Sequence, residues 1–525
     1  MSLPRSSGVL LHPTSLPGPD GIGDVGPESV RLLDFLADAG QRVLQVLPLG
    51  PTGYGDSPYQ SFSTFAGNPL LVSAAILEEE GLLSSADLSA RPEFPSDHVD
   101  YGRVIDWKRT LLRRAWEAYR HDAGRPEQQA FTAFCEQHRH WLDDFALFMA
   151  LKDRHGGVQW TLWDRPFALR DPDAIAQARD DMDDAISAIK FAQFLFFRQW
   201  DRFRAEARGR DIRIIGDIPI YVAHDSADVW AHPELFQLDA EGNPTVVAGV
   251  PPDYFSKTGQ LWGNPIYRWD YAAETGYAWW VERLRATLGL VDVVRLDHFR
   301  GFESYWEVPA GEPTAENGHW ASGPKDWIFD TFKFVYGPDL PIIAEDLGVI
   351  TPEVEALRKR FNLPGMAVFQ FGYGKDAASS PLPLHAFHYR LVAYSGAHDN
   401  DTLMGWWSSL DVDPAGQATK AYVRRYLEIS DADEVNWVVI RALMASVADV
   451  VITPVQDLLG LGSEARMNYP GRSHGNWTWR MAPDALTPAL IKRLRELTER
   501  YGRLPAEPMG DPVKPIDLPP RTQTP

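Results

Sequence analysis

The stretch Pro341–Asp346 reads PIIAED, a short apolar run that ends abruptly in two carboxylates. Such a run is typical of a strand buried on both faces of a parallel sheet. Seven other stretches of the chain have a similar form. In chain order, the eight predicted strands are Gly8–His12, Val43–Pro48, Ile212–Pro219, Val291–His298, Pro341–Asp346, Met366–Phe371, Leu391–Asp399 and Val450–Asp457.

Segments with helical spacing lie between most of these strands, for example Glu28–Ala39, Trp279–Leu288 and Pro352–Phe361. Eight strands that alternate with helices predict an α/β protein with a (β/α)8 TIM barrel. An open, doubly wound sheet also alternates strand and helix, but it rarely reaches eight buried strands. We therefore expect residues 1–525 to form a single barrel.

Two long segments interrupt the alternation. Residues 70–210, between the second and third strands, are more than one βα unit needs, and their amphipathic patterns predict a mainly helical insertion. Residues 230–267 are rich in proline, glycine and aromatic residues and predict a long loop above the barrel rim.

The composition narrows the function further. With 51 basic and 72 acidic residues the formal net charge is −21, so a nucleic acid is an unfavourable partner. The single cysteine, Cys135, excludes an intrachain disulfide, and no run of about 18 apolar residues predicts a membrane span. We expect a cytoplasmic protein without membrane partners.

Four of the predicted strands end in carboxylates, and a histidine or an arginine accompanies some of them. Because active sites of TIM barrels lie at the carboxyl ends of the strands, these side chains are expected on one rim. They are Asp217, Asp297, Glu345 and Asp399, with Arg295, His298 and His398 beside them.

Converging carboxylates have two main uses in a barrel mouth: they bind a divalent cation, or they act on a glycosidic bond as nucleophile and proton donor. Arg295 lies two residues before Asp297 and therefore on the same face of its strand, where it can keep that carboxylate ionised. This pairing favours the glycosidic chemistry. The chain has no HExxH motif, phosphate-binding loop or cysteine-rich spacing to support a metal site.

Four segments at these strand ends resemble the conserved regions of the α-amylase clan. They are Gly216–Tyr221, Arg295–Gly301, Ala344–Gly348 and His398–Asp401.

Further segments resemble one family of that clan, the 4-α-glucanotransferases of glycoside hydrolase family 77. They run from the first strand to beyond the eighth, so the resemblance covers nearly the whole chain. These segments are His12–Gly18, Leu47–Gly53, Ser57–Gln60, Gly249–Phe255, Gly259–Pro265, Gln456–Gly460, Asn468, Pro470 and Gly475–Trp477.

The resemblance implies an enzyme that transfers segments of α-1,4-glucans, malto-oligosaccharides among them, by a retaining double displacement and without a cofactor or metal. It implies that Asp297 is the nucleophile and that Glu345 is the general acid and base. Asp399 would hold two hydroxyls of the sugar at the cleavage point.

Other residues would bind the substrate around this centre. The resemblance places five of them near the sugar at the cleavage point: Arg295, His298, His398, Asp217 and Tyr59, the last as a stacking platform. A sixth, Asn468, lies in the segment after the eighth strand. The rim loop would form a lid over the acceptor, touching glucan through Asp253, Tyr254, Phe255, Gln260 and Trp262.

Two other functions remain open on the sequence. A plain α-glucan hydrolase shares every chemical step until water replaces the acceptor sugar. A non-catalytic glucan-binding protein would tolerate the loss of Asp297 or Glu345, and both are present.

Overall fold

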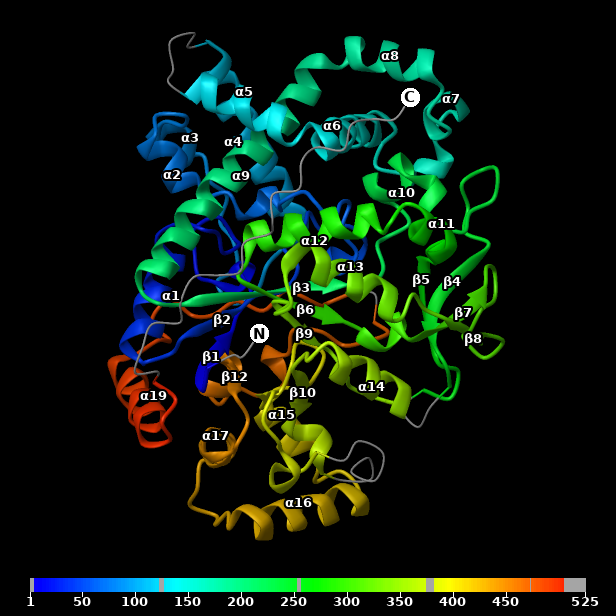
Figure 1. Ribbon diagram of the computed structural model, residues 1–525. Coiled ribbons are helices and arrows are strands. Elements are labelled where there is room, and N and C mark those ends of the chain that lie inside the picture. Colours follow the sequence, from blue (N-terminus) through cyan, green and yellow to red (C-terminus); the bar gives the residue numbers. More distant parts are fainter. Residues whose placement is uncertain (1–3, 122–126, 253–255, 374–381, 473, 505–525) are drawn as a thin grey trace.

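Eight parallel strands form a nearly closed barrel at the centre of the computed structural model, which describes residues 4–121, 127–252, 256–373, 382–472 and 474–504 (Figure 1). Each predicted strand is confirmed. The strands are β1 (Ser6–Leu10), β2 (Val43–Gln45), β3 (Arg213–Pro219), β6 (Val293–Asp297), β9 (Ile342–Ala344), β10 (Gly365–Val368), β11 (Leu391–Tyr394) and β12 (Val450–Pro454). Their order in the sheet is β10-β11-β12-β1-β2-β3-β6-β9, and the Ala344 N–H donates to the Pro364 carbonyl at 2.9 Å across the gap between β9 and β10.

The inside of the barrel is a packed core of its own. Side chains of a strand alternate between the two faces, so every second residue points inward. The inward residues include Leu10, Val43, Ile215, Val293, Ile343, Met366, Val368, Val392, Tyr394, Val450 and Ile452, and all are buried. Residues two positions further along each strand point to the same side. The polar residues at the ends of the strands therefore also point inward.

Helices cover the outside of the barrel, because their apolar stripes pack against the outward faces of the strands. On α1, for example, Leu32, Leu33 and Leu36 are buried. The helices that follow or flank barrel strands are α1 (Pro27–Asp38), α12 (Ala278–Leu290), α13 (Asp326–Tyr336), α14 (Pro352–Arg360), α15 (Leu403–Ser409), α16 (Pro414–Leu427), α17 (Val435–Ala445), α18 (Val455–Leu458) and α19 (Pro488–Arg500).

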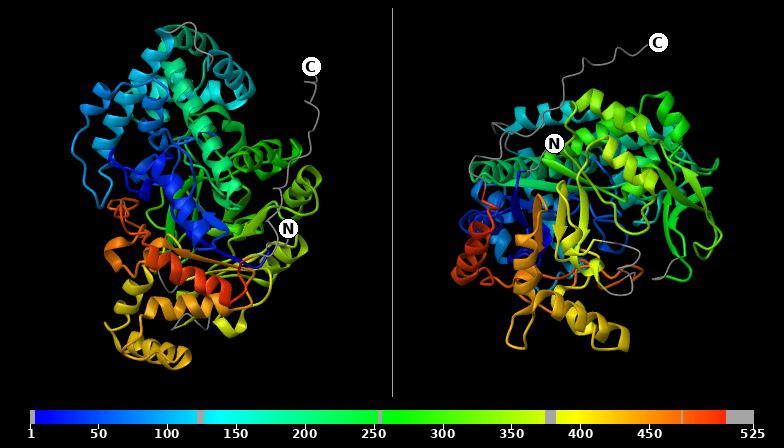
Figure 2. Two further views of the ribbon diagram at one scale, coloured as in Figure 1. Left: turned by 90° about the vertical axis from the view of Figure 1, so that its left-hand side faces the viewer. Right: turned by 60° about the horizontal axis from the view of Figure 1, so that its bottom comes forward.

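Among the described residues, eight α-helices lie in the chain between β2 and β3 and gather at one end of the molecule, opposite α16 (Figures 1 and 2). They are α2 (Ala74–Glu79), α3 (Ser85–Ser89), α4 (Tyr101–His121), α5 (Glu127–Gln137), α6 (Arg139–Arg154), α7 (Arg165–Ala168), α8 (Pro172–Asp181) and α9 (Asp183–Gly209). No helix of the described residues is long and apolar enough to span a membrane.

A second, antiparallel sheet stands beside the barrel, and the sequence did not predict it. Its order is β5-β4-β7-β8, with β4 (Val246–Val250), β5 (Gln260–Pro265), β7 (Ser304–Pro309) and β8 (His319–Ser322) (Figure 1). Two short helices, α10 (Ala227–Ala231) and α11 (Trp269–Glu274), flank the first pair. The segment expected to be a long loop is therefore built partly from strands.

Candidate active site

The polar residues at the barrel mouth occupy the last inward-facing positions of the barrel strands. Ile215 points inward on β3, so Asp217 does too, and on β6 the inward Val293 is followed by Arg295 and Asp297. Asp217 pairs with Arg295 in the register of the two strands. The packed interior thus ends in a charged layer.

Arg295 connects two of the four carboxylates. Its Nη1 lies 2.9 and 2.7 Å from the two oxygens of Asp217 and 2.9 Å from Oδ1 of Asp297. Arg295 and Asp217 are buried, whereas the side chain of Asp297 is 28% exposed. Burial raises the pKa of Asp217, and the adjacent guanidinium opposes that rise. Of these two carboxylates, Asp297 is therefore the one that is open to solvent, and the guanidinium of Arg295 lies next to it.

Glu345 follows β9 and is held by backbone groups. Its Oε2 accepts from the N–H of His298 at 2.8 Å and its Oε1 from the N–H of Leu347 at 3.0 Å. His298 has a left-handed backbone (φ 52°), a conformation that is uncommon for a non-glycine residue. Burial raises the pKa of Glu345 to about 8, with Arg295 opposing the shift and Asp297 adding to it. At neutral pH this carboxyl carries a proton.

Asp399 has the opposite character. Its Oδ2 lies 3.1 Å from Nε2 of His398, and its Oδ1 accepts from Nδ2 of Asn468 at 2.6 Å. Desolvation by the surrounding protein alone would raise the pKa of Asp399, but His398 and the hydrogen bond from Asn468 outweigh it and lower the pKa to about 2. The side chain is 52% exposed, so an ionised carboxylate is available at the surface of the cleft.

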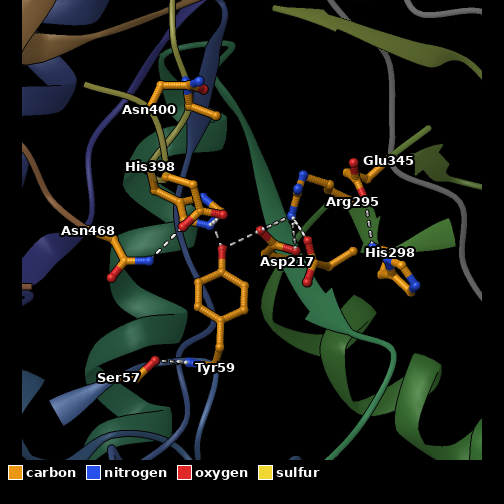
Figure 3. A network of polar contacts seen from close by, with 12 residues as sticks. Ser57, Tyr59, Asp217, Arg295, His298, Glu345, His398, Asn400 and Asn468 are labelled. Atoms are coloured by element: carbon orange, nitrogen blue, oxygen red, sulfur yellow. Dashed lines mark hydrogen bonds and ion pairs between the residues drawn. The ribbon is translucent and has the colours of Figure 1, made fainter. Parts of the chain in front are cut away.

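Tyr59 connects the two sides of the cluster. Its hydroxyl donates to Oδ2 of Asp217 at 2.8 Å and lies 3.2 Å from Nδ1 of His398 (Figure 3). The rings of Tyr59 and His398 stack with their centroids 4.7 Å apart, and Trp477 packs against both. The aromatic residues so form an apolar wall beside the carboxylates, which suits the face of a sugar ring.

The structure brings together most of the residues predicted for substrate binding. Trp262 on β5 meets the ring of His298 edge-on with centroids 4.8 Å apart, and Nε1 of Trp262 donates to Oε1 of Gln260 at 3.2 Å. Burial lowers the pKa of His298 to about 4, so its imidazole is neutral at pH 7. Three further residues predicted for the lid, Asp253, Tyr254 and Phe255, lie outside the described residues.

Two residues at the site were not predicted from the sequence. Trp477 lines the aromatic wall, and Arg466 donates from Nη2 to the backbone carbonyl of Asp399 at 2.7 Å. Both lie well beyond the end of β12, so a search for polar residues at strand ends could not identify them. Trp477 lies within a segment that resembles family 77, and that was the one available hint.

The cluster combines Glu345 with its raised pKa, Asp297 beside the guanidinium of Arg295, the ionised Asp399 and an aromatic wall. A protonated carboxyl next to a carboxylate that is paired with an arginine is suited to acid–base and nucleophilic work on a glycosidic bond. In the described part of the chain, no group of three or more His, Cys, Asp or Glu is arranged to hold a metal ion.

Comparison with known proteins agrees with this geometry. Residues 11–487 match the family model described as 4-alpha-glucanotransferase. A 4-alpha-glucanotransferase of Thermus thermophilus is 52% identical over 96% of this chain and 100% of its own length, and one of Synechocystis is 49% identical over 95% and 98%. The solved structure of an amylomaltase from Streptococcus agalactiae in complex with acarbose has a TM-score of 0.91 at 39% identity, covering 95% of this chain and 99% of that one.

Proposed function

The chain belongs to the 4-alpha-glucanotransferase family, glycoside hydrolase family 77, and we propose that Asp297, Glu345 and Asp399 carry out its transfer reaction on α-1,4-glucans. The observation that carries this proposal is the different surroundings of two carboxyl groups in one cluster. Glu345 has a raised pKa of about 8, while Asp297 is paired with Arg295 at 2.9 Å. A retaining double displacement needs one carboxyl as a proton donor and one as a nucleophile.

In the first step, an oxygen of Asp297 attacks the anomeric carbon of the donor glucan. The glycosidic C–O bond breaks, and the proton of Glu345 passes to the departing 4-oxygen. In the second step, the 4-hydroxyl of an acceptor glucan attacks the same carbon, its proton passes to Glu345, and the ester bond to Asp297 breaks. We expect the two carboxyl groups to be about 5–5.5 Å apart, as retaining enzymes require.

Asp399 binds hydroxyls of the sugar at the cleavage point in this scheme. Its low pKa of about 2 keeps it an acceptor throughout, with His398 and Asn468 fixing its two oxygens. Tyr59 provides the stacking surface for the same ring, supported by the contacts of its hydroxyl. Arg295 places its guanidinium 2.9 Å from Asp297 and has Asp217 as its second partner.

The acceptor side is covered in this proposal by the segment 230–267, with Gln260 and Trp262 contacting glucan. Its support is the position of Trp262 against His298, whose own backbone N–H holds Glu345. A cover at this place excludes water from the covalent intermediate, so that a sugar hydroxyl is the favoured acceptor.

Incubation with maltotriose alone tests the reaction. Transfer yields glucose together with longer oligosaccharides, whereas hydrolysis shortens the whole population. The variant Asp297→Asn should lose turnover and retain maltotriose binding. If this variant disproportionates maltotriose at the original rate, Asp297 is not the nucleophile.

A further inference from the structure

Asp457 is a buried carboxyl that takes no part in the reaction described above. It follows β12 on the short helix α18 and is 1% exposed. Its Oδ2 accepts from the hydroxyl of Ser395 at 2.6 Å, and its Oδ1 accepts from the backbone N–H of Leu403 at 2.7 Å. One carboxyl thus joins two residues that lie eight positions apart in the chain.

Ser395 and Leu403 are the two ends of the loop that carries His398 and Asp399. Ser395 comes directly after β11, and Leu403 is the first residue of α15. The position of the loop relative to the barrel is therefore set at both ends by the same side chain, Asp457.

Three more residues of the segment after β12 also contact this loop, in addition to Gln370 and Tyr59 from other parts of the barrel. Ser463 donates to Oδ2 of Asp401 at 2.7 Å, and Arg466 and Asn468 hold the backbone carbonyl and the carboxylate of Asp399. These three residues follow Asp457 in the chain. The segment after β12 is thus the support on which the Asp399 loop rests, and Asp457 is its most deeply buried contact.

Burying the carboxyl group of Asp457 costs free energy. Among the described residues no lysine or arginine forms an ion pair with it, and burial raises its pKa to about 6, against the hydrogen bonds from Leu403 and Ser395. An uncompensated buried carboxylate costs free energy, so those two hydrogen bonds are its main stabilisation. These two hydrogen bonds are made to the two ends of the loop of Asp399, at Ser395 and at the first residue of α15.

We propose that Asp457 is a positioning residue for the transfer reaction, which places Asp399 and His398 by holding both ends of their loop. This inference rests on the proposed role of Asp399. Catalytic groups must be held within about 0.5 Å of their productive positions, and a misplacement of about 1 Å can cost about 100-fold in rate. A loop released at both ends would exceed that tolerance.

The test measures kcat and KM for maltotriose with Asp457→Ala, Asp457→Asn and Ser395→Ala, each per amount of folded protein below the onset of melting. For Asp457→Ala we expect kcat to fall by about 10- to 100-fold with a smaller change in KM, because contacts to the distorted sugar strengthen in the transition state. Asp457→Asn should keep most of the rate, since its amide can accept from the Leu403 N–H and donate to the Ser395 oxygen. The kcat of Ser395→Ala should lie between those of the two Asp457 variants. The double variant that combines Ser395→Ala with Asp457→Ala should have nearly the same kcat as Asp457→Ala alone.

A matched control is Asp292→Asn. Asp292 is also buried and accepts from a backbone N–H, that of Ile214 at 2.9 Å, but it precedes β6 and lies at the opposite end of the barrel. Unlike Asp457, it also pairs with Arg204 and Arg208, at 3.5 and 3.2 Å. This variant should lower the melting temperature without lowering kcat.

The proposal is overturned if Asp457→Ala melts earlier but keeps kcat and KM, or if Asp457→Asn loses as much rate as Asp457→Ala. Should Asp457→Ala not fold, an unchanged kcat in Ser395→Ala overturns it equally. Asp399→Asn separates this result from a failure of the proposed function. If that variant keeps its activity, the role of Asp399 is wrong, whatever Asp457 does.

Discussion

Glu345 and Asp399 show how the surroundings of a side chain decide its chemistry. Both are carboxylic acids of one cluster, yet the pKa of Glu345 is raised to about 8 and that of Asp399 lowered to about 2. Desolvation raises the pKa of both, but only Asp399 has a histidine and an amide directly on its oxygens. A proton donor and a permanent acceptor are the result.

The raised pKa of Glu345 makes the pH dependence of the reaction testable. The acid form is needed for the first step, and it persists up to the folded-state pKa of about 8. We therefore expect kcat/KM for maltotriose to fall as the pH rises through about 8. Glu345→Gln cannot donate this proton, and its kcat should drop by about 100- to 10,000-fold.

A pH–rate profile between pH 5 and 10 checks the first expectation, with the melting temperature recorded at each pH as a control. An alkaline limb that stays flat beyond pH 9, or a Glu345→Gln variant of normal activity, would contradict the assignment of Glu345 as the acid.

At the scale of elements, the small antiparallel sheet is the feature that the sequence pattern did not reveal. Its strands are short and partly exposed, and β4 pairs with β7, a strand some 60 residues further along the chain. Similarly, the amphipathic patterns of residues 70–210 did not reveal where one helix ends and the next begins: α5 ends at Gln137 and α6 begins at Arg139. Such breaks depend on packing partners that the local sequence does not name.

The position of β5 leads to a prediction about the fate of the intermediate. Replacing Trp262 by alanine removes the ring that covers His298 and should admit water to the acceptor side. We expect the ratio of transfer to hydrolysis to fall several-fold, measured as newly formed reducing ends against longer oligosaccharides.

Leu261→Ala is the matched control for this experiment. Leu261 is the neighbouring residue on β5, so its side chain points to the opposite face of the strand, and it is exposed. If both variants change the product ratio equally, or neither does, Trp262 does not exclude water.

At the scale of the whole molecule, one arginine fastens the end of the described chain to the barrel. Arg503 is fully buried and donates only to backbone carbonyls. Its acceptors are Ser6, Leu443, Met444, Ser446, Ala448 and Asp449, at 2.8–3.4 Å. Burial lowers the pKa of Arg503 to about 9. The side chain closes the ends of β1, α17 and β12 against one another.

Arg503→Ala should therefore destabilise the fold by about 1–3 kcal/mol, because six carbonyls lose one hydrogen bond each, while Arg5 and backbone N–H groups still donate to five of them. Thermal melting followed by circular dichroism measures the effect. KM for maltotriose should not change, since Arg503 lies near the amino ends of β1 and β12, away from the cluster. Arg500→Ala, an exposed position on α19, should leave the melting temperature as it is. A normal melting temperature for Arg503→Ala would refute this view.

The chain's sequence alone determined the barrel, because each strand buried on both faces leaves a local apolar run that needs no partner to be recognised. The same runs end at Asp217, Asp297, Glu345 and Asp399, so four carboxylates of the cluster could be placed at one rim, although the strand before Asp399 already ends at Tyr394. What only the tertiary structure decided is which of them carries a proton and what holds Asp399. Protonation depends on burial and on charges from other strands, and the partners Asn468, Arg466 and Asp457 lie 58 to 69 residues away. A local sequence pattern cannot identify partners that are so far apart in the chain, because these residues meet only when the strands close into a barrel.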